Sequence, residues 1–117
     1  MFDFDWETQF VDSPYTETTR LITRSVCDSF KNGWIGRRLP RMFREHGMKD
    51  VSIAARTVTI PYPFLELLLG GHLTRIQKAG VLSPSEADRW WTHLRRAHEA
   101  ETFVYGFTAL IVAGVKS

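Results

Sequence analysis

The pattern of apolar and polar residues predicts a short strand followed by two helices. In the opening FDFDW, apolar and acidic residues alternate, which is typical of a strand that ends after a few residues. Ser13 as a cap and Pro14 in the first turn predict the start of a helix whose apolar face continues to Lys31. A second helix follows, with Leu39 facing inward, arginines facing outward and Gly47 in the left-handed conformation that ends it.

The middle of the chain predicts a second strand and a strongly apolar helix. β-branched residues are frequent between positions 51 and 60, and Pro61 ends this strand because proline cannot continue a hydrogen-bonded ladder. The apolar helix begins at about Phe64. It is predicted to weaken or kink at Gly70 and Gly71, since glycine is unfavourable inside a helix.

The last third of the chain predicts a helix with a well-defined start and a final strand. Ser83 and Glu86 have the spacing of a capping box, and the helix after them continues to about Ala100. Apolar residues over 103–115 predict a long last strand. The order of one strand, two helices, one strand, two helices and one strand indicates an α/β fold in a single domain, residues 1–117.

Composition places the chain among globular proteins. Hydrophobic residues make up 44% and charged residues 24% of the 117 positions, which is enough apolar area for one core. Cys27 is the only cysteine, so an internal disulfide is excluded, and a small buried hydrophobe is favoured over a reactive thiol. The longest apolar stretch is too short to span a bilayer, so we expect a cytoplasmic protein without a membrane segment.

Charge is distributed unevenly along the chain. Residues 1–17 contain five acidic and no basic residues, whereas residues 31–49 contain six basic residues and one glutamate. The basic run suggests contact with phosphate, and nucleic-acid binding is one alternative. The solvated face of a single helix explains the same run more simply and is favoured. The arginines concerned are Arg37, Arg38, Arg41 and Arg44.

Three segments carry a resemblance to a known family. They are FDFDWETQFVDSP, NGWIGRRLPRMFREHGMKDVSI and FVYGFTALIVAGVKS. Their order and spacing resemble the C-terminal part of class I S-adenosylmethionine-dependent methyltransferases, from the fifth strand to the closing seventh strand. The helical pair over 64–100 is similar to an insertion in the small-molecule branch related to quinone-biosynthesis enzymes.

This resemblance implies the C-terminal part of a Rossmann-like sheet, with about three strands, the last one antiparallel, and four helices. It also implies a transferase that methylates a small acceptor. The family holds its cofactor with a glycine-rich turn after the first strand and an acidic residue after the second, and neither has a counterpart here. Gly33 and Gly36 do not follow a strand, and Gly70 and Gly71 lie within an apolar helical run.

We therefore expect a chain without the cofactor-binding half, as a separate short protein or a truncated copy. Alone it would bind no cofactor and catalyse no reaction; completed by a cofactor-binding partner chain, it would use S-adenosylmethionine. The sequence predicts no catalytic residue and no metal ligand, because its four histidines lack the spacing of a metal site.

The resemblance also implies candidates for a pocket that holds the methyl acceptor. In the family, substrates lie beyond the carboxyl ends of the strands. This makes Asp5, Trp6, Trp34 and Arg37 candidate pocket residues, with Trp34 able to stack on an aromatic or isoprenoid acceptor. The alternative, that Trp6 and Trp34 are core or connector aromatics, is favoured.

A self-associating interaction protein is the main alternative function. An incomplete sheet leaves an edge strand whose backbone groups are free to pair with another chain. The edge expected to face the missing half would then pair with a second copy, giving a homodimer. The two hypotheses differ in their ligand, because the methyltransferase hypothesis predicts a small molecule near Trp6 and Trp34 and the dimer hypothesis a dry interface.

Overall fold

The computed structural model describes residues 1–116 and has the predicted order of elements. It is an α/β fold with four helices and a three-stranded open sheet, as the sequence predicts. The elements are β1 (Phe2–Val11), α1 (Thr16–Ser29), α2 (Ile35–Glu45), β2 (Met48–Thr59), α3 (Tyr62–Lys78), α4 (Pro84–Glu99) and β3 (Tyr105–Lys116).

The last strand of the chain lies in the middle of the sheet. The strand order is β1-β3-β2, and β3 is antiparallel to both neighbours, which confirms the predicted antiparallel last strand. Thr108 is the partner of Asp5 on one side and of Thr57 on the other. Because both neighbours oppose β3, β1 and β2 are parallel to each other, and helices α1 and α2 connect them.

Strand β1 is longer than predicted and contains an irregularity. It spans ten residues, and its register with β3 shifts between Asp5 and Phe10. There the Thr8 hydroxyl donates to the Asp5 carbonyl over 2.6 Å and accepts from the Thr108 amide over 2.8 Å. A side chain thus replaces a ladder bond at the bulge, so β1 continues to Val11 although regular pairing is interrupted.

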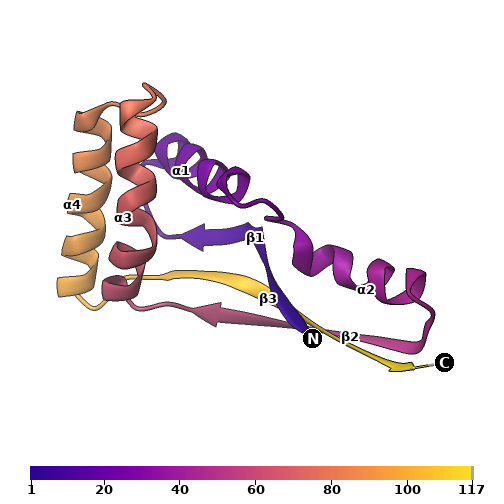
Figure 1. Cartoon of the computed structure of the whole chain (residues 1–117). Coiled ribbons are helices and arrows are strands. Elements are labelled where there is room, and N and C mark those ends of the chain that lie inside the picture. The colour runs from indigo at the N-terminus through magenta and orange to yellow at the C-terminus, as the bar shows by residue number, and fades with distance from the viewer. Residues whose placement is uncertain (117) are drawn as a thin grey trace.

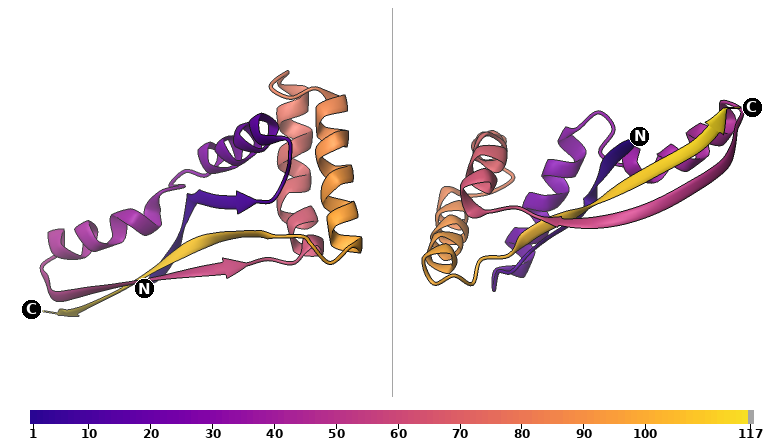
Figure 2. Two further views of the ribbon diagram at one scale, coloured as in Figure 1. Left: turned by 180° about the vertical axis from the view of Figure 1, so that it is seen from behind. Right: turned by 90° about the horizontal axis from the view of Figure 1, so that it is seen from below.

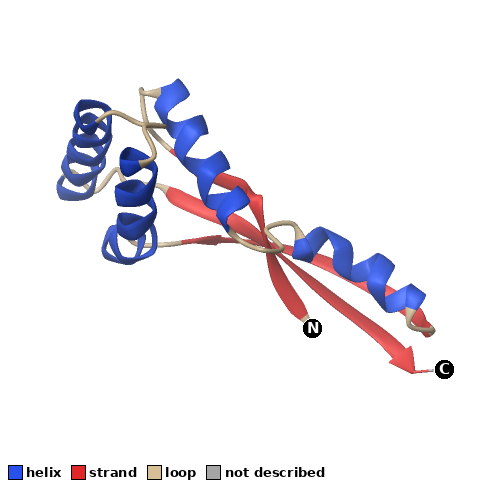
Figure 3. Ribbon diagram, turned by 45° about the horizontal axis from the view of Figure 1, so that its top comes forward, coloured by secondary structure: helices blue, strands red, loops and turns tan. Residues whose placement is uncertain are grey.

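The helices cover the sheet unevenly. Helices α3 and α4 lie side by side at one end of the molecule, next to α1, while α2 lies over the opposite end of β2 and β3 (Figure 1). Helices α1 and α2 follow one another along the sheet (Figure 3). The molecule is elongated, with extents of 55 × 32 × 21 Å. No helix within residues 1–116 is long and apolar enough to cross a membrane.

The core lies where α1, α3 and α4 meet the sheet. Trp90 of α4 is fully buried and its indole N–H donates to the Thr19 hydroxyl of α1 over 3.0 Å. Phe107 of β3 belongs to the same cluster of buried side chains. The other large members are Ile22, Val26, Tyr62, Leu65, Leu69, Leu73, Leu82, Leu94 and Tyr105.

Two predicted helix features are wrong. Helix α1 begins at Thr16 with Tyr15 as its N-cap, because β1 extends further than expected and Pro14 lies in the turn. The Ser13 hydroxyl accepts a hydrogen bond from the Tyr15 amide instead of capping the helix. Helix α3 continues unbroken through Gly70 and Gly71, since its buried leucines at four-residue spacing hold it against the core.

Other local predictions are confirmed. The Ser83 hydroxyl and the Glu86 carboxylate form the reciprocal bonds of a capping box at the start of α4. Gly47 follows α2 with a φ of 81°. Pro61 lies between the end of β2 and the start of α3.

Gly106 is the more crowded of the two glycines in the sheet. A Cβ atom there would lie 2.3 Å from the Val58 carbonyl oxygen and 2.6 Å from the Phe10 ring. We expect Gly106→Ala to lower the free energy of unfolding by about 2 kcal/mol or more, because the neighbouring strand must shift. Gly70→Ala is the matched control. Its Cβ meets nothing within 4 Å, so this substitution should raise the free energy of unfolding, measured in urea, by about 0.5–1 kcal/mol. Equal changes in the free energy of unfolding for both substitutions would contradict the close packing at Gly106.

Candidate functional site

The connector between α1 and α2 packs directly on neighbouring backbone. A Cβ atom on Gly33 would lie 2.4 Å from the Cys27 carbonyl oxygen, and one on Gly36 would lie 2.9 Å from the Asp3 carbonyl oxygen. The Gly33 carbonyl also accepts a hydrogen bond from the Trp6 amide over 2.9 Å. Gly33 in the connector and Gly36 in the first turn of α2 therefore let the chain approach β1 closely, and Trp34 between them is held next to that strand.

Asp5 and Arg37 form an ion pair between β1 and α2 in which Asp5 is buried and Arg37 is exposed. Asp5 is 4% exposed, and its two carboxylate oxygens accept from Nε and Nη2 of Arg37, the latter over 2.9 Å. Nη2 also lies 3.0 Å from the Glu7 carboxylate. The hydrogen bond to Asp5 is the main reason that the pKa of Arg37 is raised. Arg37 thus neutralises a carboxylate that would otherwise be buried without a counter-ion.

Trp34 borders this ion-paired cluster. The guanidinium carbons of Arg37 and Arg38 lie 5.3 Å and 5.5 Å from the centre of its ring, within the range of cation–π attraction. The Trp34 side chain is 39% exposed. Its ring is therefore held by arginines from α2 and still presents apolar surface to a ligand.

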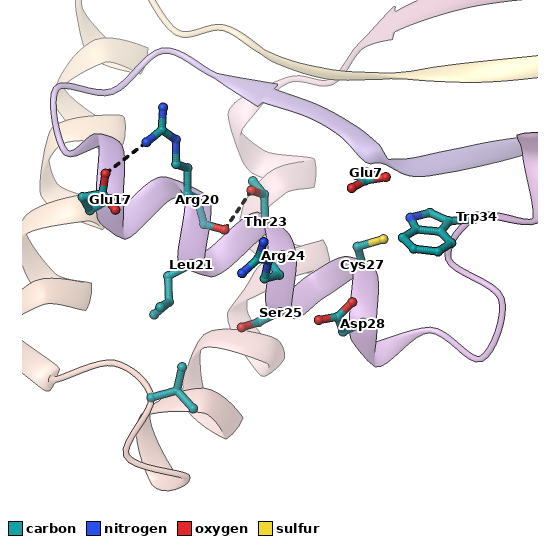
Figure 4. Close-up of a pocket in the computed structure, with 11 residues that line it drawn as sticks. Glu7, Glu17, Arg20, Leu21, Thr23, Arg24, Ser25, Cys27, Asp28 and Trp34 are labelled. Atoms are coloured by element: carbon teal, nitrogen blue, oxygen red, sulfur yellow. Dashed lines mark hydrogen bonds and ion pairs between the residues drawn. The ribbon is translucent and has the colours of Figure 1, made fainter.

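An open surface depression lies between α1 and Trp34. It has a volume of about 730 Å³, within the usual range for small-molecule sites. In Figure 4 the Cys27 sulfur points toward the Trp34 ring, with Glu7 close by. Polar and charged residues of α1 form most of the remaining wall, and Val81 of the α3–α4 connection completes it.

Cys27 is the only thiol and lies at the base of this depression. It is 6% exposed, and burial, followed by the nearby Asp28 carboxylate, raises its pKa. Both effects disfavour the thiolate, which is the reactive form of cysteine. The interpretation of Cys27 as a small buried hydrophobe is confirmed by this position.

The structure places the four candidate pocket residues in two groups. Asp5, Trp34 and Arg37 come together in the cluster described above, and of these Trp34 also lines the depression. Trp6 lies apart, with its ring 4.7 Å from that of Phe30 and 4.8 Å from that of Phe107. Trp6 is thus a core aromatic, as the favoured alternative proposed, and the depression does not include it.

The basic run on α2 is partly neutralised. Arg37 is paired with two carboxylates, and Arg41 lies 3.1 Å from Glu45. Arg38 lies over the Trp34 ring. These contacts favour the interpretation of a solvated helix face over nucleic-acid binding.

Sequence reasoning did not identify Glu7 or the depression along α1. Glu7 follows Asp5 by two residues, so the alternation of β1 was the available signal: residues two apart share one face of a strand, and both carboxylates contact the Arg37 guanidinium. The depression depends on how α1 lies beside the connector and the α3–α4 turn, which no local pattern specifies.

Comparisons with known proteins give no further guide to the site. No protein family model matches the chain, and no curated protein matches it. Within the part of the chain that the structure describes, no group of three or more His, Cys, Asp or Glu side chains is arranged to hold a metal ion. The chemistry must therefore be inferred from the geometry of the residues themselves.

Removing Arg37 tests whether it compensates the buried Asp5. We expect Arg37→Ala to lower the free energy of unfolding by about 1–3 kcal/mol, less than for a fully buried pair because Arg37 is 44% exposed. Adding Asp5→Asn should recover part of this loss, since the unpaired charge is removed. Arg41→Ala, which breaks an exposed pair, should cost at most about 0.5 kcal/mol. If the losses in the free energy of unfolding from the Arg37 and Asp5 substitutions simply add in the double variant, the two side chains do not stabilise each other.

Proposed function

We propose that this chain supplies the acceptor-side portion of a class I S-adenosylmethionine-dependent methyltransferase. In this proposal it holds a small aromatic or isoprenoid acceptor in the depression beside Trp34. A cofactor-binding partner supplies S-adenosylmethionine, and methyl transfer takes place only in the combined assembly. The chain alone is then not catalytic.

The direction and connection of the strands support this proposal. Strands β1 and β2 are parallel and joined by helices, and the antiparallel β3 ends the chain. The resemblance in sequence implies a fifth, a sixth and an antiparallel seventh strand in this order, with a helical pair before the last one. Helices α3 and α4 occupy the place of that pair, between β2 and β3.

The position of the helices relative to the strand ends gives further support. The carboxyl ends of β1 and β2 lie near Tyr105 and Gly106 of β3, at the end of the sheet where α3 and α4 stand (Figure 1). The α3–α4 turn contributes Val81 to the depression, so the helical pair reaches the proposed acceptor site. Trp34 lines the depression from the connector, which lies beside the amino-terminal half of β1.

The depression beside Trp34 is the observation that carries the proposed acceptor site. It is open to solvent, as expected for a site that a second part must close. A class I reaction depends mainly on holding the acceptor atom against the methyl group. Trp34, fixed by two glycines and two arginines, offers a rigid aromatic surface for that purpose.

The glycines of the described chain are in the wrong places for the family's cofactor turn. Gly33 lies between α1 and α2, Gly36 lies in the first turn of α2, and Gly47 and Gly80 follow helices. A nucleotide-binding turn needs glycine between a strand and the helix after it, where amides approach the ligand. Residues 1–116 contain no glycine in that setting, which is why the proposal assigns the cofactor to a partner.

Two titrations of the purified chain test the proposed division of roles. Calorimetry with S-adenosylmethionine should show no binding. A prenylated hydroquinone, used as acceptor probe, should shift the indole N–H resonance of Trp34, and Trp34→Leu should weaken its binding about tenfold or more through the lost stacking surface.

Trp91→Phe is the matched control for the acceptor titration. Trp91 packs against Trp90 and Tyr62, away from the depression, so this variant should bind the probe as the parent does. Stoichiometric binding of S-adenosylmethionine to the chain alone would contradict the proposal. Equal loss of probe binding in both variants would show that Trp34 is not the acceptor surface.

A further inference from the structure

The two edges of the sheet differ in their backbone hydrogen bonds. Met1 donates a hydrogen bond to the Val112 carbonyl of β3 and accepts one from the Val112 amide. Because the bonding direction alternates along an antiparallel ladder, the amides of Phe2, Phe4 and Trp6 point away from β3. On the other side, Ile60 donates to the Tyr105 carbonyl. By the same alternation, the backbone N–H and C=O groups of the odd-numbered residues of β2 point away from β3.

Two outward amides of β1 already donate hydrogen bonds within the chain. The Phe4 amide donates to the Asp3 carboxylate over 2.8 Å, and the Trp6 amide donates to the Gly33 carbonyl over 2.9 Å. Acidic side chains at positions 3, 5 and 7 also follow this strand. Occupied amides and like charges are the features that protect an edge strand from further pairing.

The outer edge of β2 has neither protection. Its regular part runs from Ser52 to Thr59, beyond the shift in register that follows Lys49. Arg56 is the only charged residue in that stretch, which contains no proline. Viewed from below, β2 borders the sheet and no helix lies outside most of its length (Figure 2). The outward N–H and C=O groups belong to Ile53, Ala55, Thr57 and Thr59.

We propose that this edge pairs with the same edge of a second copy of the chain, in a two-fold antiparallel dimer centred on Ala55. Ala55 then lies opposite Ala55 of the other copy, and Ile53 lies opposite Thr57. The pairing is independent of the proposed methyltransferase role, because it uses β2 and leaves β1, α1 and the depression exposed.

Charge and hydrogen bonding select this partner and this register. Pairing centred on Arg56 would place two arginines directly opposite, which is destabilising, whereas centring on Ala55 places Arg56 opposite Ala54. Pairing of β2 with β1 of the next copy would have to break the bond between Trp6 and Gly33, and it would build an open filament. The closed dimer breaks no bond. It also extends the sheet beside Ile53, which is 59% exposed.

Disulfide cross-linking tests the register. In a Cys27→Ala background, Ala55→Cys should give a covalent dimer under mild oxidation, since hydrogen-bonded partners have Cα atoms about 5.5 Å apart. Thr59→Cys is the matched control. Its two copies would be about 27 Å apart along the strands and should not cross-link. Cross-linking of Thr59→Cys in preference to Ala55→Cys would overturn the proposed register.

Sedimentation equilibrium tests the dimer itself. The parent chain should show a reversible monomer–dimer equilibrium.

Ala55→Lys should raise the dimer dissociation constant about tenfold or more by placing two ammonium groups at the two-fold axis. Leu67→Lys adds the same charge on an exposed position of α3 and should not change it. Ala55→Pro, which removes an outward amide, should also be monomeric with unchanged circular dichroism. A parent chain that remains monomeric, or equal effects of both lysines, would overturn the proposal.

Discussion

Strand β3 bonds to both other strands, and neither of those pairs with the other. The sheet therefore forms only when the twelve residues of β3 lie between two segments far earlier in the sequence, which makes its contacts predominantly non-local. Gly106 permits the closest approach in this arrangement, since it faces Phe10 and Val58 with no room for a side chain. The helices that connect the strands then pack on the sheet that β3 completes.

The candidate site follows from the same frame. Once β1 is paired, Asp5 is buried, and the carboxylate needs the guanidinium of Arg37 to compensate its charge. That requirement fixes the start of α2, and Gly33 in the connector and Gly36 in α2 let this part of the chain approach β1 closely. Trp34 is held beside the depression as a result. The proposed acceptor surface is thus a consequence of one ion pair and two close backbone contacts.

Local patterns were enough to predict the order of elements and the capping box at Ser83, because each depends on neighbouring residues. The antiparallel last strand was implied by the resemblance and not by a local pattern. They failed where tertiary contacts decide. Gly70 and Gly71 were expected to weaken α3, but the buried leucines on both sides keep it continuous. The grouping of Asp5, Glu7 and Arg37 depends on how α2 lies beside β1. Trp6 packs on Phe30 and Phe107 instead, because successive residues of a strand face opposite sides.

The two edges of the sheet differ in which outward backbone amides have an acceptor within residues 1–116: those of Phe4 and Trp6 in β1 have one, and those of β2 have none. Amide hydrogen exchange resolved by residue measures this directly. The Phe4 and Trp6 amides should be protected at every protein concentration, because their acceptors lie within the chain. The amides of Ile53, Ala55 and Thr57 should exchange rapidly in dilute solution and become protected as concentration rises. Rapid exchange at Trp6 together with concentration-independent exchange along β2 would contradict the account.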